Sequence, residues 1–178
     1  TFPWEQTYLY YSDERFVPHE SSDSNTAVIR ASGILEKIPP QQHHPFPICS
    51  TAQECAIEYA TCLREHLPQL QFDAVLLGVG EDGHVASLFP QFMTDEVQNV
   101  NLTTYTLHSP KAPPTRISLT FNAISHAQRI FCIILGSGKQ EIFQKIAVEG
   151  YVCPATHVCA DATHAQLYAD TEAAASNH

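Results

Sequence analysis

An aspartate and a histidine stand two residues apart in a glycine-rich stretch, and their side chains are suited to acid–base catalysis. Asp82 and His84 lie in GVGEDGHVASLFP, residues 78–90. An imidazole with an ordinary pKa of about 6.5 exchanges protons near neutral pH, and a neighbouring carboxylate can orient its ring. A lone histidine is usually structural, but here the glycines let the backbone approach a ligand closely. We therefore predict that His84 is the catalytic residue of a small-molecule hydrolase and that Asp82 holds its orientation.

The segments on either side of this pair determine how it is presented. Residues 74–77, AVLL, form an apolar run that predicts a strand buried on both faces of a parallel sheet. A turn with three glycines follows, and residues 84–90 predict a short helix that ends at Pro90. Because open α/β sheets bind ligands at the carboxyl ends of their strands, we expect the pair at a binding site.

The same glycines match a dinucleotide-binding fingerprint, but the surrounding sequence does not. Gly78–Gly83 is literally GxGxxG after a strand. A Rossmann helix must continue for several turns, whereas Pro90 follows Gly83 by only seven residues. The acidic residue expected about 20 positions later has no counterpart, since Asp95 and Glu96 come too early. The pattern argues against a nicotinamide or flavin cofactor, and we expect none.

A second glycine turn, GSGK, ends at Lys139. It is not an NTPase phosphate loop, because that motif needs a glycine where Ile133 stands and a serine or threonine where Gln140 stands. A glycine turn that opens a helix still offers backbone N–H groups and a positive dipole end to an anion. The spacing alone leaves two roles open for Lys139, a phosphate ligand or a solvated loop residue.

A serine nucleophile is not indicated by the sequence. No GxSxG elbow occurs, and Ser87 lies one turn beyond His84 on the expected helix. The simpler mechanism is a histidine that acts directly on water.

The composition of the chain limits which other functions it can have. The 178 residues fit a single domain, 1–178, and carry 9 basic and 19 acidic side chains, a net charge of −10 with neutral histidines. No cluster of lysines and arginines indicates nucleic-acid binding. No apolar run reaches membrane-spanning length, and the first residues, TFPWEQTYLYY, lack the charged region and apolar core of a signal peptide. We therefore expect a cytoplasmic monomer without a membrane partner.

The cysteines and a histidine pair are expected to be structural. The six cysteines contain no CxxC pair, and Cys55 and Cys62 share one face of a helical segment, so buried reduced thiols are favoured over disulfides or a zinc site. His43 and His44 lie in a proline-rich loop and lack partners at a fixed metal-ligand spacing. We predict that these histidines are exposed polar residues and that the chain has no metal site.

Strands and helices are expected to alternate, which predicts a three-layer α/β/α fold with a mostly parallel, Rossmann-like sheet. Extended segments are expected at 7–11, 100–107, 115–120, 129–135, 156–159 and 165–168. Helices are expected at 26–35, 51–67, 121–127 and 140–148. The segment 12–18 is expected to be a loop, and 92–101 a surface connection.

Four blocks of sequence resemble the 6-phosphogluconolactonase family in order and position. They are YYSDERFVP with the DSN that follows, GVGEDGHVASLFP, PPTRISLTFNAI and IILGSGKQEIF. The resemblance implies a fold shared with glucosamine-6-phosphate deaminase and ribose-5-phosphate isomerase. It also implies hydrolysis of 6-phosphoglucono-δ-lactone to 6-phosphogluconate, a step of the oxidative pentose phosphate pathway, without metal or cofactor.

The resemblance also implies a role for each matching residue. His84 would activate water against the lactone carbonyl, with Asp82 orienting its ring. Arg15 of the DER block and Lys139 of GSGK would bind the 6-phosphate, and Arg116 of PPTRIS would be a further substrate contact.

Backbone amides between Gly80 and Gly83 would stabilise the oxyanion in the same comparison. The deaminases of the superfamily share DGH but continue with Asn-Glu-Pro, whereas residues 87–90 are SLFP here. The acid used for ring opening and deamination is therefore missing, which favours the lactonase over a sugar-phosphate isomerase or deaminase.

One departure from the family concerns its amino-terminal region. Members usually begin with a strand, a helix and a glycine-rich phosphate loop, and this sequence starts at the strand after them. Either the sequence is a fragment of a longer protein or a natural protein lacks that unit, and in the second case we expect exposed apolar surface. The alternative function is then a catalytically inactive or partner-dependent sugar-phosphate-binding relative.

Overall fold

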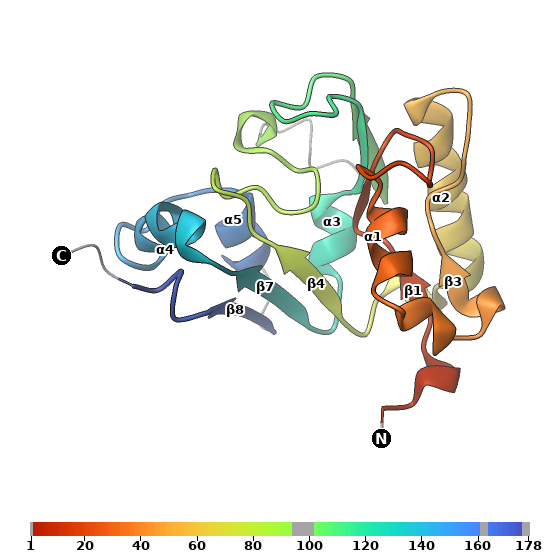
Figure 1. Cartoon of the computed structure of the whole chain (residues 1–178), viewed down its shortest axis with the longest axis horizontal. Coiled ribbons are helices and arrows are strands. Elements are labelled where there is room, and N and C mark those ends of the chain that lie inside the picture. The colour runs from red at the N-terminus through yellow and green to blue at the C-terminus, as the bar shows by residue number, and fades with distance from the viewer. Residues whose placement is uncertain (1, 94–101, 161–163, 176–178) are drawn as a thin grey trace. The chain divides into compact units, whose positions relative to one another are not determined.

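The computed structural model describes residues 2–93, 102–160 and 164–175 (Figure 1). The chain divides into two compact units, residues 1–66 with 103–118 and residues 67–102 with 119–178. The predicted connection at 92–101 lies almost wholly outside the described residues. Of the helices that the structure describes, none has the length and apolar character needed to cross a bilayer.

The first unit contains two α-helices, short 3₁₀ turns and short strands. The helices are α1 (Asn25–Ala31) and α2 (Ala52–His66), and the strands are β1 (Leu9–Tyr10), β2 (Asp13–Arg15), β3 (His43–His44), β5 (Thr103–Thr106) and β6 (Arg116–Leu119), the last of which ends at the unit boundary. Strands β1 and β3 pair in parallel, and β2 pairs antiparallel with β6 in the order β2-β6-β5.

Helix α2 forms as predicted because its start is capped and one face is apolar. Thr51 Oγ1 accepts a hydrogen bond from the Glu54 N–H at 3.1 Å, and the Glu54 carboxylate accepts one from the Thr51 N–H at 3.1 Å, which is a capping box. Along the apolar face of α2, Cys62 is half-buried. The fully or largely buried members of this face are Cys55, Ala56, Tyr59 and Leu63.

The segment predicted as a loop at 12–18 contains strand β2, and Glu14 explains its position. This side chain is 2% exposed, and its carboxylate accepts hydrogen bonds from Ser24 Oγ (2.9 Å), Asn25 N (2.7 Å), and both the N–H and the hydroxyl of Thr26 (2.9 Å each). A buried carboxylate thus satisfies the first amides of α1, where the helix dipole favours negative charge.

The second unit is built on a parallel sheet in the order β4-β7-β8. The strands are β4 (Val75–Gly78), β7 (Ile130–Ile134) and β8 (Ala165–Ala169), and the helices are α3 (Phe121–Ser125), α4 (Gln140–Ala147) and α5 (Pro154–Ala160). Helix α5 contacts β7, β8 and α3. The predicted α/β class with parallel sheets is confirmed.

The strand predicted at 156–159 is wrong, because these residues belong to α5. Pro154 occupies the first helical position, where its missing N–H costs nothing. Thr156 Oγ1 accepts a hydrogen bond from the Cys153 N–H at 2.8 Å and so caps the first turn. The β-branched residues Thr156 and Val158 favour a strand locally. The signals for a helix start at Pro154 and Thr156 override that preference in the structure.

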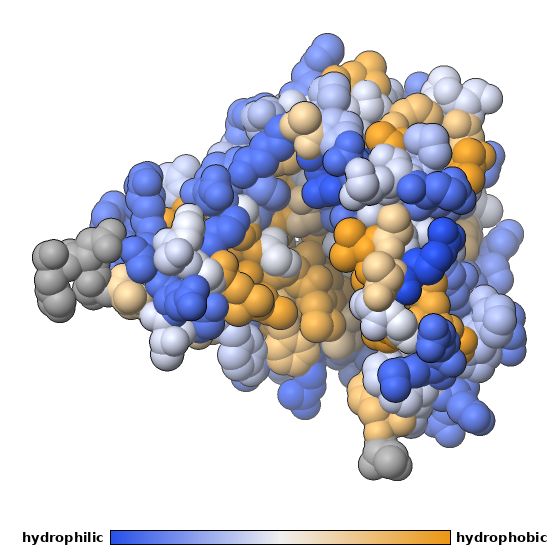
Figure 2. All heavy atoms as spheres, viewed as in Figure 1, coloured by the Kyte–Doolittle hydropathy of each residue, from blue (hydrophilic) through white to orange (hydrophobic). Residues whose placement is uncertain are grey.

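The prediction that β4 is buried on both faces is also wrong. Val75 and Leu77 are buried, but Leu76 between them is 65% exposed. The Sγ atoms of Cys159 on α5 and Cys132 on β7 lie 3.6 Å apart, so α5 covers the face that carries Val75 and Leu77. Figure 2 shows hydrophobic residues gathered on the surface over β4 and β7.

Candidate active site

The turn after β4 folds back on itself and brings His84 over Gly80. Val79 and Val85 form an antiparallel bridge, the Gly80 N–H donates to the His84 carbonyl at 2.8 Å, and the Gly83 N–H donates to the Gly80 carbonyl at 3.0 Å. The helix predicted from residue 84 is wrong. Ala86 takes a positive φ of 49°, and helical structure begins only at the 3₁₀ turn Pro90–Phe92.

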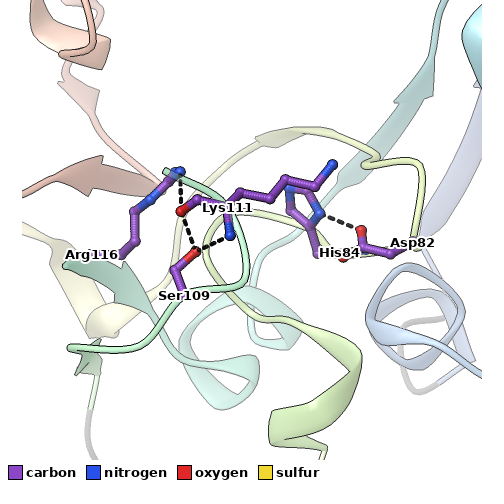
Figure 3. Close-up of polar contacts among 5 residues, drawn as sticks. All are labelled: Asp82, His84, Ser109, Lys111 and Arg116. Atoms are coloured by element: carbon purple, nitrogen blue, oxygen red, sulfur yellow. Dashed lines mark hydrogen bonds and ion pairs between the residues drawn. The ribbon is translucent and has the colours of Figure 1, made fainter. Parts of the chain in front are cut away.

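Asp82 and His84 form a direct pair within this turn (Figure 3). Asp82 Oδ1 lies 2.5 Å from His84 Nδ1 and also accepts the His84 backbone N–H at 3.2 Å. Partial burial acts to raise the pKa of Asp82, but its hydrogen bonds to His84 and the charge of His84 outweigh burial, so this pKa is lowered. An ionised carboxylate only accepts hydrogen bonds, so the neutral His84 ring carries its proton on Nδ1. Its basic nitrogen is then Nε2.

Two neighbours fix the plane of the His84 ring. Phe89, which is 1% exposed, packs against it with ring centroids 4.6 Å apart. On the other side, a Cβ atom added to Gly80 would overlap Nδ1 and Cε1 of the imidazole and come within 2.8 Å of Asp82 Oδ1. Glycine is required here by the close approach of the ring. The role of Phe89 was missed from sequence, where its only signal is its place in SLFP.

Gly83 allows the turn to pack closely against Cys153. Its φ is +85°, and an added Cβ would lie 2.6 Å from the Cys153 sulfur. The N–H groups of Gly80 and Gly83 both donate inside the turn. These two N–H groups are therefore engaged within the turn, and oxyanion binding by the backbone amides of this stretch stays a prediction.

Lys139 follows the strand next to β4. Strands β4 and β7 run parallel with Gly78 opposite Ile133, so the residues after both strands emerge at one edge of the sheet. His84 follows β4, and Lys139 follows β7 and immediately precedes α4, whose first turn has no side-chain cap. A helix start of this kind can bind an anion. The structure thus presents the predicted base and one predicted phosphate ligand from the same edge.

Asp170 shapes the turn that carries Lys139, and sequence analysis missed it. Its Oδ2 accepts a hydrogen bond from the Gly136 N–H at 3.0 Å, and its Oδ1 accepts one from the Ala173 N–H at 2.7 Å. Asp170 follows β8, so the third strand of the sheet supports the loop that follows the second. An acid directly after the last strand was the available signal.

Arg15 and Arg116 belong to the first unit and stand opposite each other on β2 and β6. Arg15 Nη1 donates to the Asp23 carbonyl at 2.6 Å, while its Nε is buried without a hydrogen-bond partner among the described residues. Arg15 also lines a cavity of about 190 Å³ with His19, Phe46 and their neighbours. An unsatisfied buried cationic donor is costly unless something pairs with it, and an anionic ligand would supply the partner.

Arg116 organises a loop. It is 5% exposed and donates from Nε to the Pro113 carbonyl at 2.7 Å and from Nη2 to the Ala112 carbonyl at 2.8 Å. Figure 3 shows its further contact from Nη2 to the Lys111 carbonyl, at 3.3 Å. Burial first, and then the charge of Arg15, lower the pKa of Arg116. Two of its guanidinium nitrogens are thus committed to the backbone, and its role as a substrate contact stays a prediction.

Comparisons with known proteins agree over most of the chain. Residues 1–168 match the model of a family described as glucosamine-6-phosphate isomerases/6-phosphogluconolactonase. The GDH/6PGL endoplasmic bifunctional protein of Homo sapiens is 37% identical over 159 residues, which cover 84% of this chain and 20% of that protein. The probable 6-phosphogluconolactonase 4, chloroplastic, of Oryza sativa subsp. indica is 34% identical over 155 residues, covering 80% of this chain and 47% of that protein.

A solved structure gives the same picture for the fold. The crystal structure of 6-phosphogluconolactonase from Thermotoga maritima is 28% identical, with a TM-score of 0.78 over 95% of this chain and 74% of that one. The chain spans about half the length of the rice relative and a fifth of the human one.

Proposed function

Because this chain belongs to the glucosamine-6-phosphate isomerase/6-phosphogluconolactonase family, we propose that it hydrolyses 6-phosphoglucono-δ-lactone to 6-phosphogluconate. The observation that carries the proposal is the pair of Asp82 and His84, 2.5 Å apart in a turn at the end of β4. The names of the human, rice and bacterial relatives support the same reaction class.

In this mechanism His84 first acts as a general base. Nε2 takes a proton from water, and the water oxygen forms a bond to the lactone carbonyl carbon. Asp82 accepts the hydrogen bond from Nδ1 and stabilises the imidazolium that results. When the carbon–oxygen bond to the ring oxygen breaks, Nε2 returns its proton to that oxygen. The carboxylic acid that forms then loses its proton to water, and the open chain leaves as a carboxylate.

Phosphate binding is assigned to two cations with different geometries. Lys139 offers a point charge beside the uncapped start of α4, and Arg15 offers a buried Nε without a partner among the described residues. A guanidinium suits bidentate contact with phosphate, whereas an ammonium contributes chiefly charge. Each residue is proposed as a ligand of the 6-phosphate group.

The test is product formation from freshly prepared 6-phosphoglucono-δ-lactone, with the spontaneous rate subtracted. We expect His84→Ala to reduce kcat by about 100- to 10,000-fold, the usual contribution of a positioned acid–base group. His126→Ala is the control, because His126 is exposed. Equal rates in wild type and His84→Ala, with both proteins folded by circular dichroism, would remove His84 from the mechanism.

The cytoplasmic location and the monomeric state remain predictions. The names of the relatives include endoplasmic and chloroplastic proteins. Fractionation of the native protein and its mass in solution would test the two predictions separately.

A further inference from the structure

Three potential metal ligands, none of which is assigned a role in hydrolysis, meet in the first unit. His44 comes from β3, and Cys62 and His66 come from the last turns of α2. The sequence prediction that His44 is an exposed loop residue is wrong, because it is half-buried beside α2. Cys62 and His66 are four residues apart on a helix and so share one face.

The two imidazole nitrogens lie nearly at the distance from the sulfur that a tetrahedral metal site requires. Cys62 Sγ lies 3.7 Å from His44 Nδ1 and 3.8 Å from His66 Nδ1, and all three atoms lie within 4.8 Å of one another. With Zn–S near 2.3 Å and Zn–N near 2.0–2.1 Å, a tetrahedral site separates sulfur and nitrogen ligands by about 3.5 Å. Side-chain shifts of a few tenths of an ångström would bring both nitrogens to that separation from the sulfur.

The His44 ring is held with its Nδ1 toward the sulfur. It stacks on Tyr10 with ring centroids 4.6 Å apart and an interplanar angle of 8°. Its Nε2 is buried without a hydrogen-bond partner among the described residues. Burial, followed by the charges of His66 and His43, lowers the pKa of His44, which favours the neutral ring that a metal needs.

Metal binding requires Cys62 to lose a proton and His66 to lose a hydrogen-bond contact. Burial and then the charge of Glu65 raise the pKa of Cys62, so the metal has to displace the thiol proton. His66 is exposed, and its Nδ1 lies 3.0 Å from the Cys62 carbonyl, a contact that it can exchange for the metal.

We propose that His44, Cys62 and His66 form a three-ligand site for Zn²⁺, with water in the fourth position. Two imidazoles and a thiolate are ligands that zinc favours, and three protein ligands with an open position is an established zinc geometry. A tight structural site would add a carboxylate or carbonyl behind each histidine. Because His44 Nε2 lacks such a partner among the described residues, we expect weaker affinity than in a four-ligand site.

A bound ion would join β3 to the end of α2 and stabilise the folded chain. The full chain, with reduced thiols and stripped of metal, should bind one Zn²⁺ by calorimetry and melt at a higher temperature in excess zinc. Co²⁺ in place of zinc should give a thiolate-to-cobalt absorption band. His66→Ala should weaken binding at least about 10- to 100-fold, since even the loss of a supporting residue costs that much.

His126→Ala is a closely matched control. Like His66, His126 is exposed near the end of a helix and its Nδ1 contacts the carbonyl four residues earlier, at 2.7 Å. It belongs to the second unit and should leave zinc affinity unchanged. Equal loss in both variants, or unchanged affinity in His66→Ala, would overturn the proposal.

A measurement on the unaltered protein tests the role of Cys62 without a substitution, such as Cys62→Ser, that could prevent folding. Zinc should slow alkylation of Cys62, mapped by mass spectrometry, and leave the half-buried Cys49 as reactive as before. Cys62 alkylation at the same rate with and without zinc, or the absence of a cobalt–thiolate band, would show that any bound zinc is held elsewhere.

Discussion

The carboxylate of Asp82 accepts two hydrogen bonds from His84, one from the ring Nδ1 at 2.5 Å and one from the backbone N–H at 3.2 Å. The same oxygen therefore fixes both the position of the histidine backbone and the tautomer of its ring. Both hydrogen bonds form between residues two positions apart in the same turn. This arrangement also makes Asp82 a positioning residue whose effects can be separated from those of the base.

Asp82→Asn should reduce kcat by about 100- to 10,000-fold with little change in KM. An amide that donates to Nδ1 would move the ring proton to Nε2 and remove the basic lone pair. Steady-state rates over a range of pH measure this effect. A purely structural role predicts instead that activity falls in proportion to the folded fraction, and such a result would contradict the assignment.

Asp82 should also contribute to stability in a pH-dependent way. Its pKa in the folded protein is below the ordinary value of 3.8, so its stabilising contribution is present above that value. The contribution is lost as the pH falls through the lowered folded-state pKa. Urea unfolding of wild type and Asp82→Asn should therefore give free energies of unfolding that converge below a pH of about 4. A constant difference across that range would contradict the prediction.

Gly80→Ala should impair catalysis because its new methyl group overlaps the His84 ring and must displace it. We expect a loss of about 100-fold in kcat, comparable to other misplacements of a catalytic group by about 1 Å. Gly78→Ala is the matched control, since a Cβ there meets nothing within 4 Å. If both variants retain wild-type rates, the ring does not need the position it occupies in the turn.

Lys139→Met should raise KM for the phosphorylated lactone by about 10- to 100-fold, the equivalent of one charge-assisted hydrogen bond. The same variant should hydrolyse glucono-δ-lactone, which lacks the phosphate, as fast as wild type does. Lys145→Met serves as the control. Lys145 lies on α4, and its substitution removes only a surface ion pair with Glu141. An equal effect of Lys139→Met on both substrates would assign the lysine a role other than phosphate binding.

Glu14→Gln should lower the free energy of unfolding by about 1.5–3 kcal/mol, because a neutral amide cannot accept all the hydrogen bonds that the buried carboxylate receives. Glu20→Gln is the control, since Glu20 is exposed. Chemical denaturation followed by circular dichroism measures both. A change of less than about 0.5 kcal/mol, typical of surface substitutions, would contradict the role of Glu14 as the cap of α1.

Local patterns predicted much of the second unit. The apolar runs at β4 and β7 indicated neighbouring parallel strands, and the contact between Asp82 and His84 was expected from their spacing. Such inferences hold because strand period and turn chemistry are encoded within a few residues.

Features that depend on distant residues could not be predicted. The exposure of Leu76 depends on which face of the sheet α5 covers, and the meeting of His44 with Cys62 depends on how the proline-rich loop returns to α2. The commitment of Arg116 to backbone carbonyls likewise requires the path of the loop at 111–113. Sequence alone gave residue types for these positions but no partners.

The contact between Gly83 and Cys153 has a consequence for oxidation. Cys153 is fully buried, and its sulfur lies so close to Gly83 that a single added carbon on the glycine would not fit. An oxygen atom added to the sulfur faces the same lack of space. Oxidant therefore reaches this thiol only when the turn has already opened, and an oxidised Cys153 would prevent the turn from closing again around His84.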